Sequence, residues 1–227
     1  MISSPRSSSC LLAMVLSCAL VFITPPFAVA QTPPDKEEVA RYSGLCAIAH
    51  NRDAAGIEKL RRADAKINAR DAHGRTALHV ATFARQGATI RALAKAGAKL
   101  GVLDDERYDV VTIAAIADDE EILRVLLSLG ASATLITSIY DGTALIATTH
   151  LGHDGVVRQL IAADAPPDHV NNLHWTALIE ASVLGDGGPC QVATVRALVE
   201  AGANTQLGDR AASRRCNLRS RAAMLTS

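Results

Sequence analysis

Two histidines provide the first arrangement of residues that could carry chemistry. His150 and His153 are three residues apart with Gly152 between them, a spacing that would suit a metal-binding pair. A zinc site needs three or four ligands in tight geometry, and no third ligand is obvious near this pair. We therefore predict no metal ion at this pair, and we predict no cofactor.

A glycine-rich segment, Gly185-Asp186-Gly187-Gly188-Pro189, is the second candidate. Glycines allow backbone N–H groups to converge on a phosphate, and Asp186 with His153 would be the candidate residues of an enzyme. No lysine follows the glycines, and the sequence contains none of the common hydrolase, zinc-protease or nucleotide-binding motifs. A turn between two helices also explains the glycines. We expect no catalytic activity, with an enzyme or small-ligand site in this loop as the alternative.

Composition narrows the choice of partners. The 227 residues include 23 Lys plus Arg and 23 Asp plus Glu, so no global field attracts nucleic acid or an anionic membrane. The hydrophobic content of 49% argues against disorder. The chain has only three Phe, three Tyr and one Trp. A core made of Ala, Leu, Val and Ile favours thin, closely stacked elements, as in a repeat protein.

Residues 1–30 have the pattern of a secretory signal peptide. Arg6 is their single charge, residues 11–24 are almost all apolar or small, and Ala28-Val29-Ala30 precedes Gln31. We expect cleavage before Gln31 and a periplasmic or secreted protein with no membrane attachment after cleavage. A lipoprotein signal ending at Cys18 and a retained membrane anchor are the alternatives. A polar linker is expected over residues 31–39.

Three cysteines, Cys46, Cys190 and Cys216, follow the predicted cleavage site. They form no C-x-x-C pair and no disulfide framework. One bridge is compatible with an oxidising compartment, and the sequence leaves its existence open.

The clearest feature of the chain is an internal repeat. Asp64-Ala65, Gly97-Ala98, Gly130-Ala131, Asp164-Ala165 and Gly202-Ala203 follow one another at steps of 33, 33, 34 and 38 residues. Thr-Ala-Leu recurs at residues 76–78, 143–145 and 176–178 in a second, consistent register. Apolar residues between these markers have helical spacing. A period of about 33 residues is that of ankyrin arrays.

The residues support the same resemblance. The segment of residues 71–81, DAHGRTALHVA, resembles the ankyrin pattern D-x-x-G-x-T-P-L-H-x-A, and residues 90–98 resemble V-x-x-L-L-x-x-G-A. The resemblance covers roughly residues 40–208. It implies an all-α repeat solenoid of five stacked helix-turn-helix repeats with β-hairpin-like fingers, at about 40–70, 71–103, 104–137, 138–171 and 172–208.

The repeat assigns structural roles. Thr76, Thr143 and Thr176 are expected to cap the first helices, and Gly97, Gly130 and Gly202 to end the second helices in left-handed turns. Arg41 and Arg107 stand where the finger glycine is expected, and Asp109 replaces the capping threonine in the third repeat. The second helix of the fourth repeat is expected to stop at Pro166-Pro167. By the resemblance, His79, His150 and His153 have packing roles.

Function follows from the resemblance rather than from chemistry. Ankyrin arrays present fingers and inner helices to a partner protein, so we expect a non-catalytic protein-interaction module that does not bind nucleic acid. A chaperone-like protector of an exported enzyme is an alternative. Trp175 aligns with Arg75 on the finger; it either faces outward as an anchor or folds back near Tyr140. The expected partner-binding residues are Arg70, Asp71, His73, Arg75, Asp104, Glu106, Arg107, Tyr140, Asp141, Asn172, His174 and Trp175.

The last segment, residues 209–227, departs from the pattern. Asp209 stands where a sixth finger would begin, but no later residue fits the register. Reading each codon with the last base of its predecessor lets Arg214-Arg215-Cys216 become Thr-Pro-Leu and Asn217-Leu218-Arg219 become Gln-Leu-Ala. We predict a disordered tail that arises from a frameshift. The fifth repeat would then lack a cap, leaving Val195, Leu198 and Val199 poorly covered.

Overall fold

The computed structural model describes residues 31–62 and 65–208. The predicted signal peptide and the predicted frameshifted tail lie outside these residues. The described residues contain helices and no strands, as the sequence predicts. The helices are α1 (Lys36–Arg41), α2 (Gly44–His50), α3 (Ala54–Arg62), α4 (Ala77–Phe83), α5 (Gly87–Lys95), α6 (Val110–Ile116), α7 (Glu120–Ser128), α8 (Ala144–Thr149), α9 (Asp154–Ala162), α10 (Ala177–Leu184) and α11 (Pro189–Glu200).

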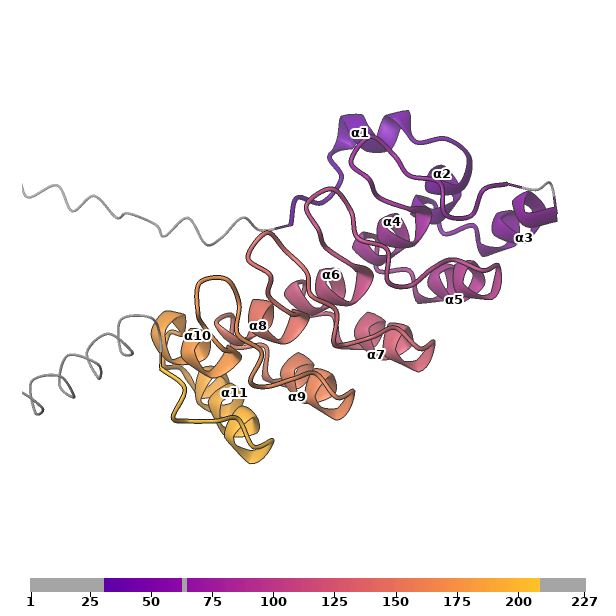
Figure 1. Cartoon of the computed structure of the whole chain (residues 1–227). Helices are drawn as coiled ribbons and strands as arrows, with labels where there is room; N and C mark the ends of the chain where they lie inside the picture. Colours follow the sequence, from indigo (N-terminus) through magenta and orange to yellow (C-terminus); the bar gives the residue numbers. More distant parts are fainter. Residues whose placement is uncertain (1–30, 63–64, 209–227) are drawn as a thin grey trace, which may run out of the picture. The chain divides into compact units, whose positions relative to one another are not determined.

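From α2 onwards the helices form antiparallel pairs that stack in two rows (Figure 1). The inner row is α2, α4, α6, α8 and α10, and the outer row is α3, α5, α7, α9 and α11, each helix contacting the next in its row. We call the pairs repeats 1 to 5, in chain order. The loops that connect one pair to the next project to one side of the inner row, and these are the expected fingers.

Side-chain caps begin the inner helices where the sequence predicts them. The hydroxyls of Thr143 and Thr176 accept hydrogen bonds from the N–H groups of Ile146 and Ile179, at 3.4 and 3.3 Å. In repeat 3 the carboxylate of Asp109 accepts from Thr112 N–H at 2.9 Å, which confirms that Asp109 replaces the threonine. Each cap satisfies an N–H group that has no partner within its helix.

The outer helices end in a left-handed residue. Gly97, Gly130 and Gly202 have φ angles of 94°, 90° and 86°, as expected. In repeat 4 Asp164 takes the same conformation, with φ of 62°, and α9 ends at Ala162. The prediction that this helix stops at Pro166 is therefore wrong. Aspartate tolerates the left-handed region better than most residues, so no glycine is needed.

The core lies between neighbouring pairs. Ile90, Leu123 and Val157 occupy one position of the outer helices, and all three are fully buried. Removing one such side chain from water contributes about 1.5–3 kcal/mol, so stacking of the repeats supplies most of the stability. In repeat 5 the equivalent Val195 is only partly buried and Val199 is 47% exposed, as predicted. The same prediction is wrong for Leu198, which is fully buried because α11 packs back against α9.

Residues 31–39 differ from the expected polar linker. Lys36–Arg41 form α1, because Asp35 caps Glu38 N–H at 2.7 Å and Glu37 and Glu38 favour the positive end of the helix. The spacing Asp35-x-x-Glu38 was a capping signal that the linker interpretation overlooked. No helix among the residues described is long and apolar enough to cross a membrane.

A candidate protein-binding surface on the fingers

Four fingers join the helix pairs, and we name each by the repeat that it precedes: finger 2 (residues 68–76), finger 3 (101–109), finger 4 (135–143) and finger 5 (168–176). Single antiparallel bridges, Arg70 to Thr76 and Thr137 to Gly142, give two of them hairpin character. A polar side chain at the start of the turn holds the loop. The carboxylate of Asp71 accepts from the N–H groups of His73 and Arg75, at 2.9 and 2.8 Å.

One position in every finger is left-handed, whichever residue occupies it. Gly74, Arg107, Asp141 and His174 have φ angles of 70°, 66°, 52° and 64°. Glycine is required only at residue 74, where an added Cβ would lie 2.2 Å from the carboxylate of Asp105 on the next finger. Arg107 therefore adopts the left-handed turn conformation without being glycine, and its charged side chain is exposed on the surface of finger 3.

Backbone hydrogen bonds join each finger to the next. Asp105 N–H donates to His73 O at 3.1 Å, Ser138 N–H to Arg107 O at 2.9 Å, and Asn172 N–H to Tyr140 O at 2.9 Å. The guanidinium of Arg70 also donates to the carbonyl of Leu103. The fingers thus form one continuous surface rather than four independent loops.

The structure sorts the twelve predicted partner-binding residues by exposure. Six are exposed, four are partly buried and two are buried. The exposed residues are Arg70, His73, Glu106, Arg107, Asn172 and His174; the partly buried residues are Asp71, Tyr140, Asp141 and Trp175; the buried residues are Arg75 and Asp104.

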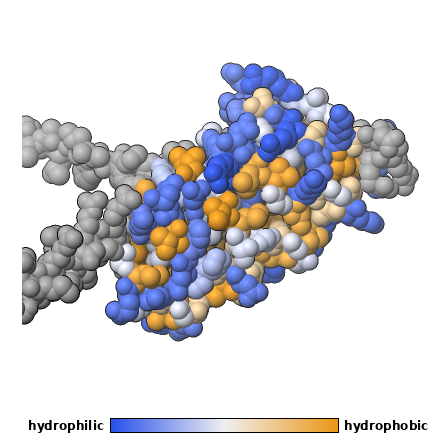
Figure 2. All heavy atoms as spheres, viewed as in Figure 1, coloured by the Kyte–Doolittle hydropathy of each residue, from blue (hydrophilic) through white to orange (hydrophobic). Residues whose placement is uncertain are grey.

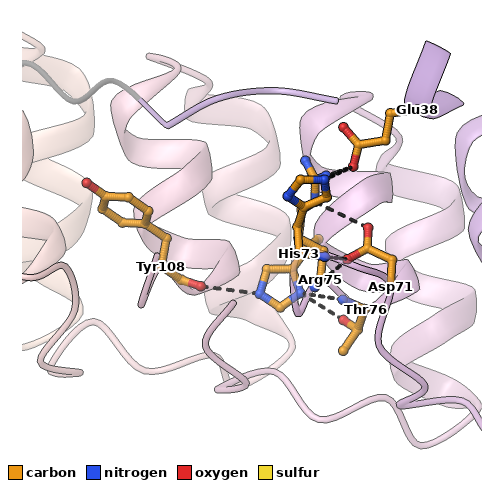
Figure 3. A network of polar contacts seen from close by, with 7 residues as sticks. Glu38, Asp71, His73, Arg75, Thr76 and Tyr108 are labelled. Carbon is orange, nitrogen blue, oxygen red and sulfur yellow. Dashed lines mark hydrogen bonds and ion pairs between the residues drawn. The ribbon is translucent and has the colours of Figure 1, made fainter. Parts of the chain in front are cut away.

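The sequence predicts that Arg75 contacts a partner, but in the structure its side chain is buried. Only 4% of it is exposed, because the guanidinium pairs with the carboxylate of Glu38 from α1 and lies 3.3 Å from Asp71 (Figure 3). His73 Nε2 lies 3.2 Å from the same Glu38 carboxylate. Burial lowers the pKa of Arg75, while Asp104, Glu106 and Asp35 oppose this shift. Arg75 thus holds α1 on finger 2.

Asp104 is also buried, at 9% exposure. Its carboxylate accepts from Tyr108 N–H at 2.8 Å, in the role that Asp71 has in finger 2. Tyr108 occupies the position equivalent to Arg75 and Trp175 and is 8% exposed. The side chain of Trp175 is partly buried. This lies between the two predicted arrangements, in which Trp175 either faces outward or folds back near Tyr140.

The sequence interpretation missed three of the four residues at the finger tips, namely Ala72, Asp105 and Ile139. Ala72, Asp105, Ile139 and Asn172 share one tip position, and all four are exposed. Ile139 is 60% exposed, the largest exposed fraction among the large apolar side chains described. Arg107 and Asp141, paired at 3.2 Å, lie on the adjoining turns, and Asn172 Nδ2 donates to Ile139 O. Figure 2 shows mainly hydrophilic side chains at the finger edge, interrupted by apolar ones. The signal in the sequence was a large apolar residue, Ile139, at a tip position that holds small or polar residues in the other fingers.

The histidines connect repeats. His79 Nδ1 lies 2.8 Å from the hydroxyl of Thr76, and its Nε2 lies 3.3 Å from Tyr108 O on finger 3. His153 Nδ1 lies 3.2 Å from Ala115 O at the end of α6. Gln191 at the equivalent place in repeat 5 donates to Thr149 O at 3.0 Å. These contacts agree with the packing roles predicted for His79 and His153.

The glycine-rich loop contains a simple turn. The carboxylate of Asp186 accepts from Gly188 N–H at 2.8 Å. Gly185 and Gly187 line a groove of about 230 Å³ together with residues of α10 and α11. Among the described residues no cluster of three His, Cys, Asp or Glu side chains could hold a metal ion.

Cys46 and Cys190 are free thiols in repeats 1 and 5, at opposite ends of the array. Burial raises the pKa of Cys46. Cys216 lies outside the described residues, so the open question of a bridge concerns its pairing alone.

Comparison with known proteins assigns the family. A family model for ankyrin repeats, in three copies, matches residues 111–209. A solved ankyrin repeat domain from Acinetobacter baumannii AYE is 40% identical, and the alignment covers 73% of this chain and 84% of that domain with a TM-score of 0.68. This chain is an ankyrin-repeat protein. The family generally binds other proteins and is typically non-catalytic.

Two further relatives agree. The solved ankyrin repeat protein EF0377 is 25% identical, with 75% of this chain and 87% of that chain covered and a TM-score of 0.65. The ankyrin repeat protein YahD of Escherichia coli (strain K12) is 38% identical over 72 residues, which are 31% of this chain. The chain spans 36% of the length of that curated relative.

Proposed function

We propose that this ankyrin-repeat protein binds a folded partner protein through its finger surface and has no catalytic role. The contacts would come from the tips of fingers 3 to 5, with Ile139 at the centre. The exposed Glu106, Arg107, Asn172 and His174 would form the polar rim.

The observation that carries this proposal is the exposure of Ile139 within a polar surface. Interfaces concentrate their binding energy in a few well-placed side chains, surrounded by polar residues that exclude water. Both signs of charge occur around Ile139, which suits a protein partner better than nucleic acid. Finger 2 is covered in part by α1, which leaves fingers 3 to 5 as the accessible part.

We also propose that the protein acts after export, in the periplasm or outside the cell. Residues 1–30 support this proposal by their single charge, apolar run and Ala-Val-Ala before Gln31.

Affinity capture from a periplasmic extract tests the function, with matched charge reversals as baits. Glu106→Lys changes an exposed finger residue, and Glu121→Lys makes the same change on the exposed face of α7. We expect one stoichiometric partner, recovered about tenfold less well with Glu106→Lys, a loss of about 1.4 kcal/mol, and unchanged with Glu121→Lys. Equal recovery by both baits would contradict a finger interface. Absence of a stoichiometric partner would favour a chaperone-like role or a small-ligand site.

A further inference from the structure

Each repeat has a face that points toward the next repeat in the chain. In repeat 5 this face differs from the same face of the earlier repeats. On the inner helices, Thr82, Ala115 and Thr149 are at most 3% exposed, and the equivalent Ser182 of α10 is exposed. In repeats 2 to 4 the following helix pair covers this position, because α4 contacts α6, α6 contacts α8 and α8 contacts α10. Within the described residues no helix pair follows α11.

The apolar residues of α10 and α11 continue this open face. Val183, Val192 and Val199 are 58%, 51% and 47% exposed. Val195 and Val192 also line the groove of about 230 Å³ between the two helices. Repeat 5 therefore carries half of a stacking interface of the kind that is buried four times within the array.

The earlier repeats show what fits such a face. The helix that stacks there begins at a capping Thr or Asp, which Leu or Val follows two residues later. Five residues after the cap it carries a small residue, which is alanine in repeats 2, 3 and 5 and Thr148 in repeat 4. In repeat 2 these residues are Thr76, Leu78 and Ala81, preceded by Gly74 in the turn. The occupant that fits this face is thus one more helix pair with the same sequence pattern.

We propose that this face accepts a sixth ankyrin repeat, encoded one base out of frame immediately after Asp209. Asp209 occupies the register of Asp71, Asp104 and Asn171, so the equivalents of Gly74, Thr76, Leu78 and Ala81 are residues 212, 214, 216 and 219. The printed residues there are Ala212, Arg214, Cys216 and Arg219, and none of them matches repeat 2.

A codon shift can restore all four positions. When each codon takes the last base of its predecessor, permitted codons for residues 212, 214, 216 and 219 yield Gly, Thr, Leu and Ala. Cys216 and Asn217 each have only two codons, and the shifted pattern requires one of each: TGC for Cys216, which yields Gln at position 217, and AAC for Asn217, which permits Leu at position 218. The open face of repeat 5 and the register of Asp209 are independent observations, and both lead to a sixth repeat as the occupant.

The coding DNA provides the first test. We expect the shifted frame to read Thr-Pro-Leu-Gln across codons 214–217. Any other reading of these four codons overturns the proposal.

The second test compares two full chains. The first, which we call the printed chain, has the present sequence. The second, the six-repeat chain, follows the shifted frame from residue 210 onward for the length of one repeat. We expect the six-repeat chain to melt at least about 5 °C higher, with slower amide exchange in α10 and α11. Equal melting temperatures and equal exchange would overturn the proposal.

Matched variants locate the effect. Val183→Ser should leave the melting temperature of the printed chain almost unchanged and lower that of the six-repeat chain by about 3 °C or more. Ile139→Ser, an equally exposed apolar change on finger 4, should act alike in both chains. If Val183→Ser acts alike in both, the sixth repeat does not cover this face. A dimer of the printed chain in sedimentation, lost with Val183→Ser, would make a second copy the occupant and overturn the proposal.

Discussion

Ile139 is a residue whose identity the fold does not require. Its tip position holds Ala72, Asp105 and Asn172 in the other fingers, and its side chain is 60% exposed. An apolar side chain so placed contributes little to folding, and its burial in a complex would contribute to binding.

Ile139→Ser should therefore weaken partner binding by about 1–3 kcal/mol with little change in melting temperature. Titration calorimetry with the captured partner measures the first quantity and thermal unfolding the second. Leu151→Ser is the control, since Leu151 is 43% exposed between α8 and α9 and belongs to no finger. Equal losses of affinity for the two variants would remove Ile139 from the interface.

Asp109 provides a second prediction at the residue scale. Burial raises the pKa of this helix-capping carboxyl, and hydrogen bonds from Thr112 only partly oppose the shift. A raised folded-state pKa stabilises the fold below the unfolded pKa of about 3.9, and this contribution is lost as pH rises through the folded value. Threonine caps the equivalent helices in repeats 2, 4 and 5 without a charge.

Asp109→Thr should consequently match or exceed the native chain in stability at pH 7, and should lose this advantage as the pH falls toward about 4. Asp109→Ala, which removes the cap as well as the carboxyl, should be about 1–2 kcal/mol less stable than Asp109→Thr at both pH values. Urea unfolding at the two pH values measures all three chains. A threonine variant that gains relative stability as the pH falls would contradict the argument.

At the scale of elements, α1 depends on one carboxylate. Glu38 is the partner of both Arg75 and His73, and its side chain is 14% exposed. The neighbouring Glu37 is exposed. The two residues therefore form a matched pair on one helix.

Glu38→Gln should lower the free energy of unfolding by roughly 1–3 kcal/mol, because it leaves the buried Arg75 with one carboxylate fewer. Amide exchange of residues 36–41 should become faster at the same time. Glu37→Gln should change neither quantity by more than about 0.5 kcal/mol. If both variants behave alike, Glu38 does not hold α1 on finger 2.

The helices were predictable because their signals are local and repeated. Thr76, Thr143 and Thr176 with their leucines set the register, and Asp109 was identified as a cap from position alone. Burial of Arg75 was not predictable, because it depends on α1, which lies outside the repeat pattern. The left-handed conformation of Asp164 was not predicted, because the usual signal for it is a glycine and repeat 4 has aspartate at this position.

At the scale of the whole molecule, export remains a prediction from residues 1–30. Intact-mass measurement of the protein from its native host should give a chain that begins at Gln31. A mass that corresponds to an acylated Cys18, or to the uncut N-terminus, would contradict periplasmic or secreted release.

The central claim is that the finger surface, taken as one unit, binds a partner protein. Hydrogen bonds between successive fingers hold Glu106, Ile139 and Asn172 in a fixed order, so a partner would contact them together. A photo-crosslinking residue at position 139 in the native host tests this claim most directly, with the same residue at Arg124 on α7 as control. Arg124 is exposed on the outer row of helices. We expect one crosslinked protein from position 139 and none from position 124. Crosslinking from position 124 alone, or from neither position, would contradict it.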